Sequence, residues 1–309
     1  MWTFSAHASY TARKANSRLN VLRALSDSAF GHDKECLTLT YKSMIRPFFD
    51  YAAPVVFPNF SSTSIEKLQK VQNKCLRLIT GCHFNSAIDH LHSETQILPV
   101  REHLKLLSSQ YLVRALNPNH PSHPHVVEPP LPSQRQMKET LRSKCWSAVE
   151  DILQDGIIRP EKVKEAMKSI HIQIVSDTVD AFNPNRVLGT IPPLIHPSES
   201  SLPRTTRTVL AQLRSGFCAR LNDYRHRIGG TDTDLCPDCS NATHSTSHLF
   251  SCTANPTNLS TTDLWENPRL AAAFLATTSS FSDLPDPGPS PPPPPRRRRM
   301  ARPPPQPPP

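Results

Sequence analysis

Four residues in the last third of the chain have types and spacing suited to holding a metal ion. Two residues separate Cys236 from Cys239, and three separate His248 from Cys252. A Cys-x2-Cys turn directs two thiolates at one centre, and residues one helical turn apart can face the same point. Three sulfurs and one imidazole favour a closed tetrahedral shell around a structural Zn²⁺, because a catalytic site keeps one ligand position open.

The same stretch allows two alternatives. His244 also lies one helical turn from His248 and competes as the nitrogen ligand. His248 is favoured because Ser247 and the apolar pair at 249–250 flank it, which indicates an ordered helix start. The cysteines could instead form a disulfide or be unrelated buried thiols. We expect no signal peptide, so the eight cysteines of the chain favour reduced thiols and metal ligation.

The composition indicates a basic chain whose core is often interrupted. Hydrophobic residues make up 37% of the 309 residues, and 33 prolines against 8 glycines imply stiff, helix-breaking connections. The net charge of +9 points weakly to a polyanionic partner. No apolar run approaches the roughly 18 residues that span a membrane. We therefore expect no membrane partner and an intracellular location, nuclear or cytoplasmic.

Helical periodicity predicts a mainly α fold. The clearest helix starts with a capping box formed by Thr63 and Glu66 and ends at Gly81. Residues 137–176 form a second helical segment, in which the alternation at 171–175 favours a short strand. A His/Pro-rich stretch at 117–136 and a Pro-rich stretch at 177–203 are expected to be linkers. His120, His123 and His125 could bind a metal, but a plain linker is favoured.

Two sets of basic residues are candidates for contacts with phosphate groups. The first repeats at steps of three and four, lines one outer face of the 63–81 helix, and comprises Lys67, Lys70, Lys74 and Arg77. The second lies on two helices expected between 204 and 228, with the basic side chains outside, and comprises Arg204, Arg207, Arg214, Arg225 and Arg227. Neutralising phosphates would release counterions from a nucleic acid. An ordinary solvated face is the alternative interpretation.

Residues 276–309 form a low-complexity tail rich in Pro and Arg, which we expect to be disordered. Its arginine block could be a nuclear address, a nonspecific anion binder or an accident of composition. Its proline run could bind a polyproline-recognising partner.

Several longer strings resemble the reverse transcriptases of jockey-type non-LTR retrotransposons, in the part that follows the polymerase palm. They are LTYKSMIRPFFDYAAPVVFP at 39–58, LQKVQNKCLRLITGC at 68–82, HLHSETQILPVREHLKLLSSQYL at 90–112, LPRTTRTVLAQLRSGFCARLNDYRHRIG at 202–229, and the Cys/His stretch at 236–252. Their order follows the family, and the resemblance covers about residues 3–275.

The resemblance implies a thumb-like helical bundle over 1–116 and a region of basic helices with a Cys-Cys-His-Cys zinc module over 204–275. The family's polymerase activity needs acidic side chains that hold two metal ions. This chain has no Asp-Asp pair, and we expect the palm and the endonuclease to be absent, so no catalytic residue is assigned.

These observations support two functional hypotheses. In the first, the chain is a fragment of an RNA-directed DNA polymerase that binds RNA or DNA without catalysing synthesis. In the second, it is a noncatalytic interaction module with a structural zinc site and a polyproline tail. A pseudogene product with no stable function is a third hypothesis. Salt-dependent binding to nucleic acid would discriminate the two hypotheses.

Overall fold

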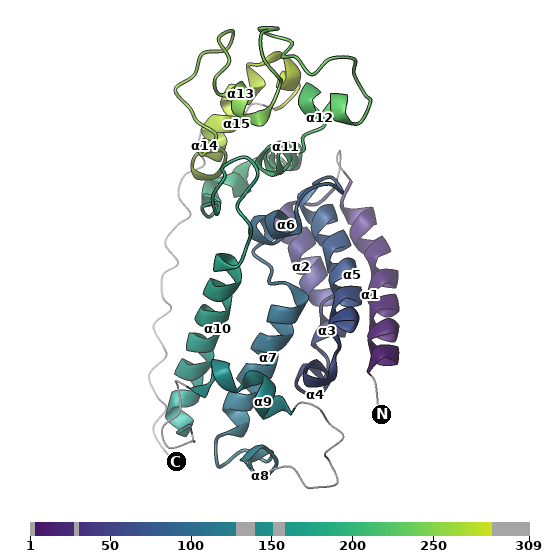
Figure 1. The fold of residues 1–309 in the computed structure, drawn as a ribbon, viewed down its shortest axis with the longest axis vertical. Coiled ribbons are helices and arrows are strands. Elements are labelled where there is room, and N and C mark those ends of the chain that lie inside the picture. The colour runs from purple at the N-terminus through teal and green to yellow at the C-terminus, as the bar shows by residue number, and fades with distance from the viewer. Residues whose placement is uncertain (1–3, 28–30, 128–139, 151–157, 286–309) are drawn as a thin grey trace, which may run out of the picture.

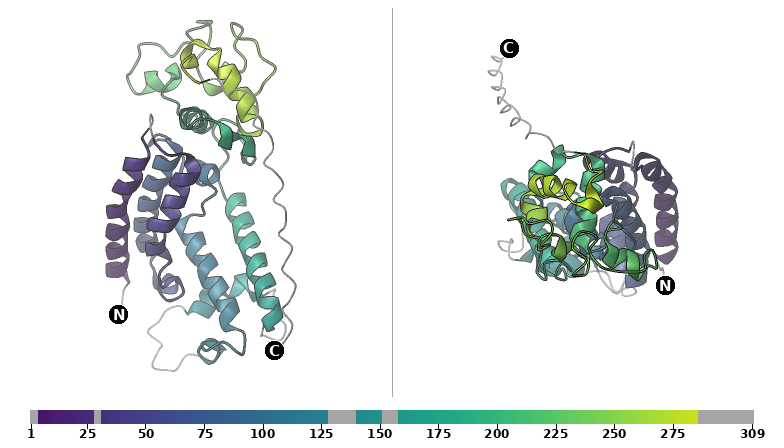
Figure 2. Two further views of the ribbon diagram at one scale, coloured as in Figure 1. Left: turned by 180° about the vertical axis from the view of Figure 1, so that it is seen from behind. Right: turned by 90° about the horizontal axis from the view of Figure 1, so that it is seen from above.

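The computed structural model describes residues 4–27, 31–127, 140–150 and 158–285. The predicted mainly α class is confirmed, and the described residues contain no β-strand beyond one isolated bridge between Leu235 and Thr243. A helical bundle carries a smaller module on one end (Figures 1 and 2). The disorder predicted for the tail at 276–309 is wrong for residues 276–285, which include the 3-10 turn η7 (Ser279–Phe281) and bury Phe281 and Leu284 in an apolar core. Residues 286–309 lie outside the described ranges.

The bundle is built from the helices that precede residue 181. They are α1 (Ser5–Leu25), α2 (Lys34–Met44), α3 (Pro47–Asp50), α4 (Ala53–Val56), α5 (Ser62–Thr80), α6 (Ile88–Thr95), α7 (Val100–Ala115), α8 (His123–Val127), α9 (Leu141–Cys145) and α10 (Val163–Asp180). The module contains α11 (Arg204–Ser215), α12 (Asn222–Arg227), α13 (Thr246–Leu249), α14 (Asp263–Glu266) and α15 (Pro268–Ala276).

Helix α5 is the centre of the bundle and packs against α1, α2, α6 and α7. Its buried residues recur at the helical period, as Leu68, Cys75 and Ile79 illustrate. The helix ends at Gly81, whose φ of 71° provides the left-handed C-terminal cap. The predicted capping box is wrong, because Ser61 is the N-cap and its hydroxyl accepts from the Ser64 N–H.

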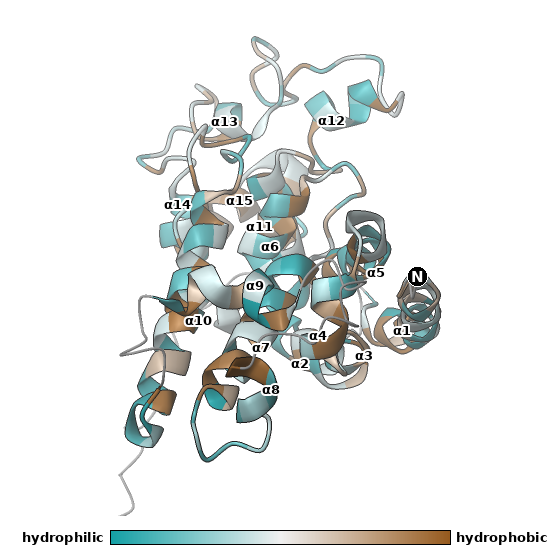
Figure 3. Ribbon diagram, turned by 60° about the horizontal axis from the view of Figure 1, so that its bottom comes forward, coloured by the Kyte–Doolittle hydropathy of each residue, from teal (hydrophilic) through white to brown (hydrophobic). Residues whose placement is uncertain are grey.

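Helix α1 shows the same division between faces. Ala15, Leu19 and Leu22 are buried, whereas Arg13 and Arg18 are exposed. Figure 3 shows the hydrophilic side of α1 turned away from the other helices. The helix therefore contributes apolar surface to the core and a basic face to the exterior.

The strand predicted at 171–175 is wrong, because these residues lie within α10. Ala166, Ile170, Ile174 and Thr178 are buried at a spacing of four, and α10 packs along α7. Within the helical segment expected over 137–176, the described residues form α9, a 3-10 turn at Trp146–Ala148 and most of α10. Residues 137–139 and 151–157 lie outside the described part. Buried residues of this segment join the core of the bundle.

The module has its own apolar core. Leu210, Leu213, Trp265, Leu275 and Phe281 are among its buried members. The stretch expected as a linker at 177–203 is folded in part, because α10 runs to Asp180 and the 3-10 turn η6 (Pro197–Ser201) packs against α15. Helix α11 faces the bundle and also contacts α14 and α15. It is the element that connects the two cores.

Candidate functional site

The structure brings the four predicted metal ligands together. Ligand atoms of Cys236, Cys239, His248 and Cys252 all lie within 4.8 Å of one another. The Sγ atoms of Cys236 and Cys252 are 3.9 Å apart, and Cys239 Sγ is 3.3 Å from His248 Nε2. In a tetrahedral shell with bonds of about 2.3 Å to sulfur, sulfur atoms lie about 3.8 Å apart, whereas a disulfide requires about 2.05 Å. The geometry therefore fits a metal centre.

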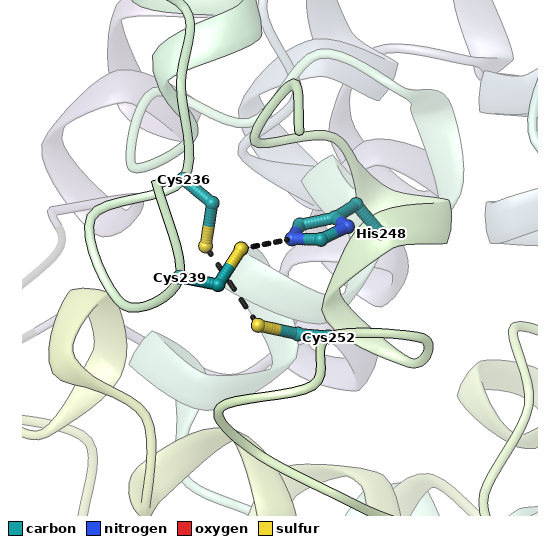
Figure 4. A group of neighbouring side chains, drawn as sticks. All are labelled: Cys236, Cys239, His248 and Cys252. Atoms are coloured by element: carbon teal, nitrogen blue, oxygen red, sulfur yellow. Dashed lines mark hydrogen bonds between the residues drawn. The ribbon is translucent and has the colours of Figure 1, made fainter. Parts of the chain in front are cut away.

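Local backbone structure directs these side chains inward (Figure 4). The Cys236 N–H donates to Ala242 O, and the Ser240 N–H donates to Cys236 O, which closes a tight turn around Cys239. Ser240 adopts a φ of 55° at this turn. On the other side, the Ser245 hydroxyl caps α13 by accepting from the His248 N–H. These bonds are formed within a short stretch of chain and hold the Cys236–Cys239 turn and His248.

The two cysteines of the turn differ in acidity. Burial raises the pKa of the Cys236 thiol. The backbone N–H of Asn241 lowers the pKa of the Cys239 thiol, which favours the thiolate that a metal binds. A bound cation would favour deprotonation of both thiols further.

His244, the competing nitrogen ligand, lies outside the cluster of four. Its side chain is buried, and its Nδ1 accepts from the Asn222 N–H at 3.2 Å. Its backbone N–H donates to Asp234 O. His244 therefore connects the metal loop, as we call residues 236–252, to α12. Burial lowers the pKa of the His244 imidazole.

The stretch that carries the four candidate ligands is anchored to α11 through α13. The buried Thr246 hydroxyl, two residues before His248, donates to Leu213 O at 3.2 Å. Leu249 belongs to the same apolar core as Leu210 and Leu213. A metal that orders α13 would therefore also hold its contacts with α11.

Two arginines expected on the outside of α11 are buried, so that expectation is wrong. The Arg214 side chain is 0% exposed and the Arg207 side chain 5%. Neither guanidinium presents surface to a phosphate. Leu210 and Ala211 lie between them at the spacing that forms one helical stripe, and this face of α11 packs inward. The spacing of Arg207, Leu210, Ala211 and Arg214 in the sequence is typical of a buried helical stripe, but the positive charge of the two arginines favoured the prediction that they are exposed.

Arg214 is the centre of an ion-pair network at the junction of bundle and module. It pairs with Glu94 of α6 at 2.9 Å and with Glu199 of η6, and its Nε donates to Leu264 O. Lys34 of α2 lies 2.9 Å from Glu94 and 3.5 Å from Glu199. Burial alone would raise the pKa of Glu94, but Lys34 and Arg214 lower it to about 2. The acidic partners are far apart in sequence, and no motif identified them.

Arg207 extends the same network. Its guanidinium donates to both carboxylate oxygens of Glu35, at 2.7 and 2.5 Å, and lies 3.8 Å from Glu199. Burial favours the neutral form, yet Glu35 raises the pKa of Arg207. Three basic groups (Lys34, Arg207 and Arg214) thus face three acidic groups (Glu35, Glu94 and Glu199) at the junction, and of the acidic side chains Glu94 and Glu199 are buried, whereas that of Glu35 is 59% exposed.

Arg204 also serves the junction. Its guanidinium donates to Ser26 O at 3.1 Å and to Leu78 O at 3.2 Å. These carbonyls lie at the carboxy-terminal ends of α1 and α5, where a cation is favoured by the helix dipole. Helices α1 and α5 therefore end side by side beneath α11. A guanidinium occupied in this way is a structural group and a poor candidate for phosphate binding.

Three lysines of the first basic set remain on the surface. Lys67, Lys70 and Lys74 are exposed along one face of α5, and we call them the lysine strip. No ion pair involves them in the part of the chain that the structure describes. Lys67 donates to the Ser9 hydroxyl of α1 at 3.0 Å, so the basic face of α1 adjoins the strip. The fourth member, Arg77, instead donates to Phe84 O and Ser86 O.

Arg225 and Arg227 lie on α12 and are exposed. Arg227 pairs with Asp223 at 2.9 Å and lies 5.4 Å from the centroid of the Phe217 ring. Arg225 makes only a long hydrogen bond of 3.4 Å to Gly230 O among the contacts described for its side chain. Of the five arginines in the second basic set, these two face solvent.

Comparisons with models of protein families, with curated proteins and with solved structures find no match. None of the helices in the described ranges combines the length and apolarity needed to cross a membrane.

Proposed function

We propose that the chain binds RNA or DNA through the phosphate backbone and catalyses no synthesis, as a relative of the carboxy-terminal part of a non-LTR reverse transcriptase. The lysine strip carries this proposal. It presents exposed ammonium groups on a single helical face, and Lys67 contacts Ser9 of α1, a helix that carries further exposed basic residues. Unneutralised cations in a row can displace counterions from a nucleic acid without reading its sequence.

The metal centre would have a structural role in this function. Three thiolates and one imidazole favour Zn²⁺ over harder cations, and four protein ligands leave no position for a substrate. Cys236, Cys239, His248 and Cys252 would hold the ion. The ion would stabilise the short, polar stretch at 236–252 and thereby fix α12 with its exposed arginines.

The test is a titration of an RNA and a DNA oligonucleotide at several salt concentrations. Charge reversal of the lysine strip (K67E/K70E/K74E) should weaken binding and reduce the slope of log K against log salt by about 2 to 3, or about 0.7 to 0.9 for each lost contact. The matched control reverses three exposed lysines of α10 and of the 3-10 turn η5 (Pro160–Lys162) that precedes it (K162E/K164E/K168E). It produces the same change in net charge and should affect the slope less.

Equal effects of the two triple variants would show that net charge alone governs binding. Absence of binding even at low salt would contradict the proposal and favour a protein-interaction module. Template-dependent primer extension by the purified wild type would contradict its noncatalytic part.

A further inference from the structure

A pocket of about 530 Å³ opens at the junction of bundle and module. Residues of α6, of the segment that follows α10 and of the end of α11 line it. Its walls include apolar groups of three elements, namely Ile88, Phe182 and Phe217. Its polar lining includes Asn85, Ser93 and Asn183. Pockets of this size with an apolar wall and a few polar groups are typical of sites for small organic groups.

A rigid turn places a cation at this pocket. Asn185 is buried, accepts from the N–H groups of Val187 and Leu188, and donates to Arg214 O. The next residue, Arg186, lines the pocket, with its guanidinium 5.0 Å from the centroid of the Phe217 ring. Arg186 is exposed and forms no ion pair with any residue of the described ranges. Its charge is therefore available to an anionic ligand.

The acidic residue of the lining is already engaged. Asp89 accepts from the backbone N–H and from the side-chain amide of Asn183, at 3.1 and 2.7 Å. Two hydrogen bonds stabilise the carboxylate and occupy its Oδ2 atom, although its negative charge remains. Arg186 offsets the charge of Asp89 and, without an acidic partner in the described ranges, is the group of the lining that can pair with an anion.

The lysine strip is connected to the same pocket through Arg77 and the turn at 84–86. At its end, Arg77 donates to Phe84 O at 3.0 Å and to Ser86 O at 3.4 Å, and so holds the turn between them. The Phe84 side chain on this turn is 76% exposed, and the following residue, Asn85, lines the pocket. A row of cations, an exposed aromatic ring and a pocket thus follow one another over the surface.

We propose that this pocket takes one unstacked base of a single-stranded RNA or DNA, with a neighbouring phosphate at Arg186 and Phe84 as a stacking platform. This inference rests on the proposed function and specifies the form of its partner. A base within a duplex exposes only its edges, whereas a base in a single strand can leave the stack and enter a pocket. Aromatic rings next to backbone-tracking cations are the general means of binding such strands.

The experiment compares one single strand of about 12 nucleotides with the duplex of the same sequence. The strand carries the fluorescent base analogue 2-aminopurine. Ser93→Phe fills the pocket from α6 and changes no charge. Ser176→Phe makes the same substitution on the exposed face of α10, outside the pocket, and is the control. Far-UV circular dichroism verifies that both variants are folded.

Wild type should bind the single strand and change the fluorescence of the analogue. S93F should weaken single-strand binding by about tenfold, the equivalent of one lost stacking interaction, and should leave duplex binding unchanged. Arg186→Met should weaken single-strand binding without filling the pocket, and S176F should have no effect.

Normal single-strand binding by S93F, together with weak binding by K67E/K70E/K74E, would overturn the pocket assignment and leave the proposed function intact. Equal losses for strand and duplex in S93F would also overturn it. Absence of binding to either nucleic acid by the wild type would refute both proposals.

Discussion

Replacing Glu94 by Gln tests the ion-pair network that joins bundle and module. The carboxylate lies 2.9 Å from both Lys34 Nζ and Arg214 Nη1, and the Glu94 side chain is 1% exposed. Gln keeps the size of the side chain and removes its charge. Arg214, itself 0% exposed, would then retain Glu199 as its only close acidic partner in the described structure.

The expected cost is about 3–5 kcal/mol in the free energy of unfolding, because removal of one partner leaves an uncompensated buried charge. Urea unfolding followed by circular dichroism would measure it at neutral pH and a fixed metal concentration. Glu165→Gln is the matched control. Glu165 pairs with Lys162 at 3.1 Å, but its side chain is 71% exposed, so its loss should cost less than about 0.5 kcal/mol.

A double-mutant cycle with Arg214→Met separates the pair from its surroundings. Removal of both charges should cost less than the sum of the two single changes, because the stranded charge disappears. The reasoning is refuted if E94Q is no more destabilising than E165Q, or if the two single changes are additive.

Three further outcomes are expected. The first concerns pH. The pKa of Glu94 is about 2 in the folded chain against an ordinary 4.5, so the contribution of the carboxylate to stability is complete above about pH 4.5 and is lost toward pH 2. The difference in unfolding free energy between wild type and E94Q should therefore shrink over this interval, and a constant difference would contradict the assigned pKa. Cys239→Ser should release the metal and expose residues 235–252 to protease, because structural metal sites supply on the order of 10–16 kcal/mol of folding free energy. Elemental analysis and limited proteolysis would measure both effects, with Cys36→Ser as the control outside the site. A metal-free wild type that resists protease at 235–252 would refute this prediction. Gly81→Ala should lower the midpoint of thermal unfolding, at a cost of about 1–3 kcal/mol. The φ of Gly81 is +71°, and the new Cβ would lie 2.5 Å from Thr208 Cγ2. A second change, Thr208→Ser, should relieve only the steric part of this cost, and an unchanged midpoint in Gly81→Ala would show that the site tolerates the methyl group.

The sequence predicted the Cys/His cluster that could hold a metal ion and the main helices, because both depend on nearby residues. Cys236 and Cys252 are only sixteen positions apart, and a turn and one helix start are enough to bring their sulfurs together. Helix α5 was predicted because its apolar residues repeat at the helical period and Gly81 ends it. The strand predicted from the short alternation at 171–175 is wrong, because the burial of Ile170 and Ile174 in α10, which packs against α7, favours a helix there.

The tertiary structure alone decided which charges are internal. Glu94 and Arg214 are separated by 120 positions, and Glu199 joins them from a stretch expected to be a linker. An arginine on an apolar stripe can extend to water or be buried beside an acid, and the choice depends on whether folding supplies that acid. Local spacing carries no information about such distant partners. The sequence therefore determined which four side chains come together as a possible metal site, and the packing of α11 determined which of its basic residues are buried.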